Sequence, residues 1–135
     1  MIDGDTIDID FHGRRERVRL LGVDAPESVH PSVPIQCFGP EASAELARAL
    51  PPSSEVRIER DVEPRDRYNR LLLYVYRVED NLFMNRWLVR SGLADTSFYE
   101  PNTALAAELT EARTMARAER AGLWGACEGP DQPLQ

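Results

Sequence analysis

Apolar and polar residues alternate along several short stretches of the chain, which is the pattern of half-buried β-strands. Residues 7–11 and 14–23 show this alternation on either side of a two-residue turn, so together they predict a β-hairpin. Residues 55–62 predict another short strand, followed by a polar turn over residues 63–69. The dense apolar stretch 70–78 predicts a strand that is buried on both faces at its centre.

Three other segments have the patterns of α-helices. The first carries a proline in its first turn and stops before a pair of prolines, and the second ends on a glycine at the C-cap position. The third and longest spaces its leucines and alanines three and four residues apart, which gives it one apolar face. The predicted helices cover residues 39–50, 82–92 and 103–122.

The order of these elements is strand, strand, helix, strand, strand, helix, helix. It favours an α+β fold, because short strands and helices are grouped apart. A small antiparallel barrel is the natural closure of such a sheet, since it removes exposed edges. The length of 135 residues predicts one domain over residues 1–126, with a Gly- and Pro-rich flexible tail over residues 127–135. The proline-rich segment 23–40 predicts a long loop of functional importance.

The charge balance changes the expected partners. The chain has 23 acidic and 16 basic residues and a net charge of −7, which by itself argues against a nucleic-acid partner. The net charge does not determine the electric field around a particular site, however, and a metal site requires carboxylates. Every basic residue is an arginine, so each cation of the chain can bind an anion through a planar fork of donors.

Carboxylates cluster at two turns. Residues 3–5 form a tight Asp-Gly-Asp turn before the hairpin, and Asp24 and Glu27 follow the second strand. Pro26 stiffens the chain between these two side chains. Carboxylate oxygens together with a backbone carbonyl, such as that of Ala25, are the ligands of a hard cation such as Ca²⁺. Each turn taken alone has the simpler interpretation of a solvated bend.

Arginines accompany both turns and the entry to the most apolar strand. Arg19 precedes the carboxylates, and Arg67 and Arg70 flank Tyr68 in the polar turn. Taken together, these groups fit attack on a phosphodiester, with a cation for the phosphoryl oxygens, a carboxylate for water and guanidiniums for the developing charge. An arginine at the rim of a barrel also has the simpler interpretation of a solvated residue.

The two cysteines, Cys37 and Cys127, lie far apart in the sequence and have no partner at metal-ligand spacing. Their spacing leaves two interpretations open. One is a disulfide that ties the start of the first helix to the C-terminal segment, and the other is a pair of buried free thiols. No apolar run approaches the length of a membrane span, and no leader precedes Asp3.

Several motifs, in their order and spacing, resemble the staphylococcal nuclease (thermonuclease) family. The resemblance runs from Asp3 to about Trp124 and includes DGDT, RLLGVDAPE, FGPEAS, DRYNRLLLYVY, MNRWLVRSGLAD and GLW. It implies an OB-fold-type barrel of five strands with three helices. It also implies a Ca²⁺-dependent phosphodiesterase that cleaves DNA and RNA at the 5′ oxygen and leaves 3′-phosphate ends. The alternative is a non-catalytic module of the same type that binds nucleic acid or protein, although such a module is expected to have lost site residues.

The resemblance implies a role for each matching residue. Asp5, Asp24 and the carbonyl of Ala25 correspond to calcium ligands, and Glu27 corresponds to the general base toward water. Arg19 and Arg70 correspond to the guanidiniums that grip the scissile phosphate. Arg67 takes a basic position near the terminal phosphate, and Tyr68 and Tyr99 line the nucleotide pocket.

The chain also departs from the pattern of that family. The first barrel strand, which precedes the DGDT motif, is missing from this sequence, so we expect a monomer or a strand-exchanged oligomer. Asn69 replaces a glycine, and asparagine tolerates the left-handed backbone expected there. The stretch 29–33 lacks lysines, which favours short or single-stranded substrates. The resemblance favours the Cys37–Cys127 disulfide and a secreted or cell-envelope protein, and the sequence alone leaves a cytoplasmic location open.

Overall fold

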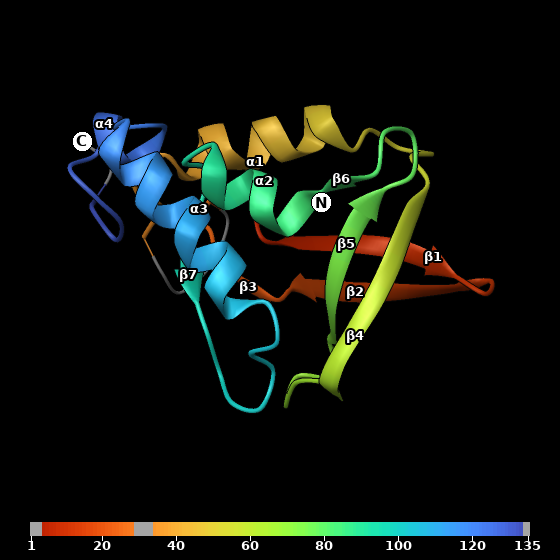
Figure 1. The fold of residues 1–135 in the computed structure, drawn as a ribbon. Coiled ribbons are helices and arrows are strands. Elements are labelled where there is room, and N and C mark those ends of the chain that lie inside the picture. Colours follow the sequence, from red (N-terminus) through yellow and green to blue (C-terminus); the bar gives the residue numbers. More distant parts are fainter. Residues whose placement is uncertain (1–3, 29–33, 134–135) are drawn as a thin grey trace.

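The computed structural model describes residues 4–28 and 34–133 (Figure 1). Residues 1–3, 29–33 and 134–135 lie outside the described part of the chain. The first residue of the predicted Asp-Gly-Asp turn and the lysine-free stretch 29–33 therefore lie outside it.

Strands and helices follow one another much as the sequence predicts (Figure 1). The strands are β1 (Thr6–Phe11), β2 (Arg14–Leu20), β3 (Gly22–Asp24), β4 (Val56–Arg65), β5 (Leu71–Arg77), β6 (Leu82–Phe83) and β7 (Asp95–Ser97). The helices are α1 (Gly39–Ala49), α2 (Met84–Arg90), α3 (Ala106–Ala118) and α4 (Leu123–Ala126).

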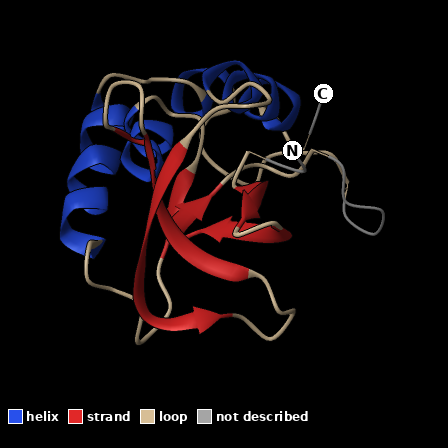
Figure 2. Ribbon diagram, turned by 90° about the vertical axis from the view of Figure 1, so that its right-hand side faces the viewer, coloured by secondary structure: helices blue, strands red, loops and turns tan. Residues whose placement is uncertain are grey.

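The main sheet has the strand order β1-β2-β5-β4, with β6 paired to β5, and β3 pairs with β7 in a second small ladder. The hairpin of β1 and β2 is antiparallel, whereas β2 and β5 pair in parallel, so the sheet is mixed. In Figure 2 the helices gather on one side of the strongly curved strands. The α+β fold and its OB-fold-type arrangement are thereby confirmed.

The shortest elements are the ones that the sequence pattern does not reveal. β3, β6, β7 and α4 have two to four residues each, which is too short to show a period. The predicted polar turn also begins later than expected, because β4 continues to Arg65 through a register shift after Arg60. This bulge bends β4 and carries it to the polar turn that precedes β5.

The main core lies between the sheet and the helices. Its fully buried side chains include Leu20 of β2, Leu73 of β5 and Leu88 of α2. Asn85 is equally buried, and its side chain accepts from the amide of Val75 and donates to backbone carbonyls of β5 and the β2–β3 turn. These bonds fix α2 against the strands that carry the site.

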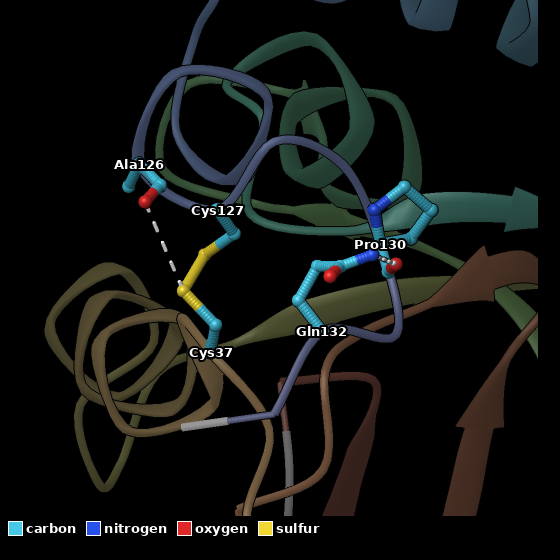
Figure 3. The surroundings of a disulfide bond; sticks show 5 residues. All are labelled: Cys37, Ala126, Cys127, Pro130 and Gln132. Carbon is cyan, nitrogen blue, oxygen red and sulfur yellow. Dashed lines mark hydrogen bonds between the residues drawn. A yellow bond between two sulfur atoms is a disulfide. The ribbon is translucent and has the colours of Figure 1, made fainter. Parts of the chain in front are cut away.

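A second, smaller core lies under the C-terminal segment. It contains Leu123, Trp124 and Cys127, packed against Cys37 and Phe38 at the start of α1. Cys37 and Cys127 form a disulfide, with Cα atoms 5.9 Å apart, so the disulfide interpretation is confirmed (Figure 3). The predicted domain boundary at residue 126 stays a prediction. Within the described part of the chain, no helix is long and apolar enough to cross a membrane.

Candidate catalytic and cation site

Asp5 is the anchor of the candidate site. It stands at the start of β1 and is 7% exposed. Its carboxylate accepts hydrogen bonds from the Ala25 amide and the Thr6 hydroxyl, both at 2.9 Å, and its carbonyl accepts from the Leu20 amide at 2.9 Å. The acidic turn is therefore tied directly to the segment that follows β3.

Arg19 reaches the same point from β2. Its Nη2 lies 3.7 Å from Asp5 Oδ2, and its Nη1 donates to the carbonyls of Leu20 and Val23. The Leu20 bond measures 2.8 Å. Because one side of the guanidinium is fixed by the backbone around β3, the group is held in a single orientation, as recognition of an anion through a fork of donors requires.

Asp24 brings a second carboxylate next to Asp5. It ends β3, where it pairs with Asp95 of β7, and the residue is exposed, although neighbouring groups remove part of the hydration of its carboxylate. Loss of hydration and repulsion by the Asp5 carboxylate raise the pKa of Asp24 to about 6, although Arg19 opposes the shift. The site therefore carries a concentration of negative charge that a bound cation would offset.

Glu27 follows two residues after Ala25 and is half-buried. Its amide donates to Gln36 Oε1 and its carbonyl accepts from the Gln36 amide, both at 2.9 Å. The backbone of α1 also approaches closely, because a Cβ on Gly39 would lie 2.1 Å from the Glu27 carbonyl oxygen. The backbone of Glu27 is thus held on two sides.

Arg70 lies one residue before β5, in a turn organised by Asp66. The Asp66 carboxylate accepts from the amides of Tyr68 and Arg70 at 2.9 and 3.0 Å, and from Arg70 Nε at 2.7 Å. Burial raises the pKa of Asp66, but these hydrogen bonds and the Arg70 charge outweigh it and hold that pKa below its usual value. Asn69 has a φ of 65°, so the predicted left-handed conformation is confirmed.

The parallel pairing of β2 and β5 relates the two arginines. Arg19 lies beside Leu72 in the register. Arg70 directly precedes Leu71, which pairs with Val18, so Arg19 and Arg70 both lie near the start of the parallel ladder. Arg70 uses Nε for Asp66, and its two terminal nitrogens have no hydrogen bond within the described part of the chain.

The aromatic residues are the most exposed members of the predicted site. Tyr68 is 65% exposed and accepts a hydrogen bond from Arg67 at 2.8 Å, and the Arg67 guanidinium lies 4.9 Å from its ring centre. Tyr99 is 74% exposed and forms no ring contact or hydrogen bond with the other predicted site residues within the described part of the chain. An exposed tyrosine of this kind presents a face on which a base can stack.

Most of the predicted residues form two groups, and within the described part of the chain Tyr99 belongs to neither. In the first group, a hydrogen bond and an ion pair join Asp5 to Ala25 and Arg19, next to Asp24. The second group lies around the β4–β5 turn and consists of Arg67, Tyr68 and Arg70. Sequence reasoning missed two supporting residues. The sequence does give one indication of the role of Asp66, because this residue lies four positions before Arg70 in a polar turn. It gives no such indication for Gln36.

The donor set suits a hard cation. Within the described residues, no cluster of three or more His, Cys, Asp or Glu side chains is placed to hold a metal ion. Ca²⁺ also binds backbone carbonyl oxygens and waters, however. The carboxylates of Asp5 and Asp24 and the carbonyl of Ala25 are oxygen ligands of the kind that Ca²⁺ binds.

Comparisons with known proteins agree with this architecture. The family described as "Staphylococcal nuclease homologue" matches residues 17–126. The thermonuclease of Staphylococcus intermedius is 43% identical over 124 residues, covering 92% of this chain and 72% of the relative. The thermonuclease of Staphylococcus hyicus is 38% identical with the same coverage. Endonuclease YncB of Bacillus subtilis is 35% identical over 125 residues, covering 91% of this chain and 58% of the relative.

Fold, site and comparisons define a small α+β protein of the OB-fold type with a carboxylate and arginine site on its sheet. The chain belongs to the staphylococcal nuclease family. Nuclease is the class of activity that this membership supports.

Proposed function

We propose that the protein is a Ca²⁺-dependent nuclease that hydrolyses phosphodiester bonds of DNA and RNA at the 5′ oxygen and leaves 3′-phosphate ends. The observation that carries the proposal is the convergence of Asp5, Arg19 and the Ala25 amide beside Asp24, in a chain of this family. A charged site held by this many bonds is preorganised for an anionic substrate.

Asp5, Asp24 and the carbonyl of Ala25 would hold the Ca²⁺ ion. When bound, the ion supplies positive charge against the phosphoryl oxygens. The side chain of Arg19 is already fixed on one edge, and its remaining donors serve a phosphate oxygen. Arg70 offers its two terminal nitrogens, because Asp66 fixes the third.

Glu27 is the proposed general base toward the attacking water. A carboxylate serves this role when it is ionised and held within hydrogen-bonding reach of the water. The backbone bonds of Glu27 to Gln36 support the second requirement. Arg67, Tyr68 and Tyr99 would bind the nucleotide, with the tyrosines as stacking faces and Arg67 toward a terminal phosphate.

The location and assembly of the protein are part of the same proposal. The Cys37–Cys127 disulfide supports a secreted or cell-envelope protein, because such bonds persist in oxidising compartments. We expect a monomer. A strand-exchanged oligomer is the alternative.

The test is cleavage of single-stranded DNA by the oxidised protein, with Ca²⁺, with a chelator, and with Glu27→Gln. We expect the parent protein to cleave DNA with Ca²⁺ and not with the chelator. The kcat of Glu27→Gln should be lower than that of the parent by about 10²-fold or more. Binding of Ca²⁺, measured by calorimetry, should be lost in Asp5→Asn and kept in Glu27→Gln. Activity that survives both chelator and Glu27→Gln would refute the mechanism. Nucleic-acid binding without cleavage would identify the non-catalytic alternative.

A further inference from the structure

Gln36 contacts the proposed general base through the backbone. Its side-chain oxygen accepts from the Glu27 amide and its own amide donates to the Glu27 carbonyl, each at 2.9 Å. Its carbonyl accepts from the Gly39 amide at 2.9 Å, which ties the same residue to the start of α1. Gln36 thus binds both backbone polar groups of Glu27, and among the described residues it forms no hydrogen bond to a predicted cation or phosphate ligand.

Gln36 is itself held by the C-terminal segment, residues 127–133. Its side-chain nitrogen donates to Asp131 Oδ1 at 3.5 Å, and Gln36 forms an isolated antiparallel bridge with Pro133. The next amide, of Cys37, donates to the carbonyl of Gln132 at 2.8 Å. Each of these contacts joins parts of the chain that are about ninety residues apart.

The C-terminal segment is anchored at the other end by the disulfide. Figure 3 shows Cys37 and Cys127 bonded between the start of α1 and the end of α4, with Gln132 turned toward Pro130 of its own segment. The dashed contact from Cys37 Sγ to the Ala126 carbonyl spans 4.0 Å. It is a packing contact, since a disulfide sulfur carries no hydrogen to donate. Cys127 is buried in the small core with Leu123 and Trp124.

We propose that Gln36 is a positioning residue for Glu27, and that the disulfide-anchored segment 127–133 holds Gln36 in place. This inference rests on the proposed function, in which Glu27 activates water. The chain of contacts runs from the disulfide through the Cys37–Gln132 and Gln36–Pro133 pairings to the backbone of Glu27. Small displacements of a catalytic group reduce the rate without weakening substrate binding, because the reacting geometry is lost.

A consequence is that catalysis depends on the oxidation state of the two cysteines. A dithiol reductant attacks one sulfur, forms a mixed disulfide, and then closes to its own disulfide. Two electrons and two protons pass to the chain, which is left with thiols at Cys37 and Cys127. The segment 127–133 then keeps only its hydrogen bonds and packing contacts to hold Gln36.

The first experiment removes the side-chain bonds of Gln36. Gln36→Met keeps the length of the side chain and deletes both the acceptor for Glu27 and the donor for Asp131. We expect kcat to fall about 10- to 100-fold with KM within about 3-fold of the parent. Thr114→Val is the control, since it deletes an exposed side-chain bond to the Thr110 carbonyl on α3, outside the proposed chain of contacts, and should leave both constants unchanged.

Two conservative variants separate positioning from general destabilisation. Gln36→Glu keeps an acceptor for the Glu27 amide but places a carboxylate against Asp131. In Gln36→Glu combined with Asp131→Asn, side chain 36 still accepts from the Glu27 amide, and the bond to residue 131 is restored with donor and acceptor exchanged. We expect the double variant to recover most of the kcat lost in Gln36→Glu. A double variant no better than Gln36→Met would overturn the proposed role of the segment 127–133.

The second experiment breaks the anchor. Cys37→Ser/Cys127→Ser, and the parent protein treated with dithiothreitol, should both show a kcat reduced about 10-fold or more at a temperature where each remains folded. Hydrogen exchange of the Glu27 amide, followed by NMR in the absence of substrate, should quicken about 10-fold in the same two samples. The disulfide joins Cys37 to Cys127, so a change at the Glu27 amide reports transmission along the chain of contacts.

The outcomes distinguish this inference from the proposed function. If the parent cleaves DNA and Glu27→Gln is inactive, yet Gln36→Met and the reduced protein match the parent, the function stands and the inference fails. If the parent cleaves nothing, the proposed function fails, and the exchange rate of the Glu27 amide still decides the positioning chain. Unchanged exchange in the reduced protein would refute it.

Discussion

The disulfide should also contribute a large part of the thermal stability. It closes a loop across a sequence separation of 90 residues. The loss of chain entropy in the unfolded state then corresponds to about 4–5 kcal/mol at 25 °C. A chain of 135 residues has an unfolding entropy near 0.28 kcal/mol/K, so removing the cross-link should lower Tm by roughly 15 °C.

Circular dichroism melts of the oxidised parent, the dithiothreitol-reduced parent and Cys37→Ala/Cys127→Ala test this value. The reduced parent keeps both sulfur atoms in place, so it isolates the cross-link from the loss of side-chain packing around the buried Cys127. The double alanine variant should melt slightly lower still. A Tm difference below about 3 °C between oxidised and reduced parent would show that the unfolded state gains little freedom, and would refute the estimate.

Three further substitutions test the site and its support. Arg70→Lys keeps the positive charge but loses the planar fork of guanidinium donors and the Nε bond to Asp66, so kcat should fall about 10²- to 10³-fold. The control is Arg57→Lys, at an exposed ion pair, which should leave kcat unchanged. Asn85→Leu leaves buried backbone groups unpaired, so it should lower the free energy of unfolding, measured in urea, by about 3–5 kcal/mol. A decrease below about 1 kcal/mol would contradict the assigned bonds. The raised pKa of Asp24, about 6, means that stability without cation increases as pH falls from about 6 toward 4. In chelator at pH 7.5, Asp24→Asn should therefore raise Tm by about 3 °C, after allowance for its exposure, and should flatten this pH dependence; a lower Tm would contradict it.

The sequence predicted the larger elements because periodicity is a property of local pattern. The hairpin, the strand at residues 70–78 and the three longer helices all show it. It could not predict the parallel pairing of β2 with β5, because pairing partners distant in sequence leave no local pattern. The ladder of β3 and β7 was missed for the same reason, and because each strand has three residues.

The supporting residues of the site were hidden for a different reason. Asp66 and Arg70 are four residues apart, so their bond could be anticipated from the turn that contains both. Gln36 acts through contacts to a segment about ninety residues away, and nothing in its neighbours distinguishes it from a solvated glutamine. Residue types that carry chemistry are visible in a sequence, whereas the residues that hold them depend on the tertiary fold.

The charge distribution explains how an acidic chain can act on a polyanion. The described residues include every arginine, and at least ten of the sixteen form ion pairs with carboxylates. Those pairs cancel much of the long-range attraction that a basic surface would exert on nucleic acid. The pairs of Arg19 and Arg70 use only part of each guanidinium, and they fix the remainder in one orientation. The same carboxylates that make the chain acidic therefore orient the donors that would bind a phosphate, so we expect catalysis to depend on preorganised local geometry more than on net charge.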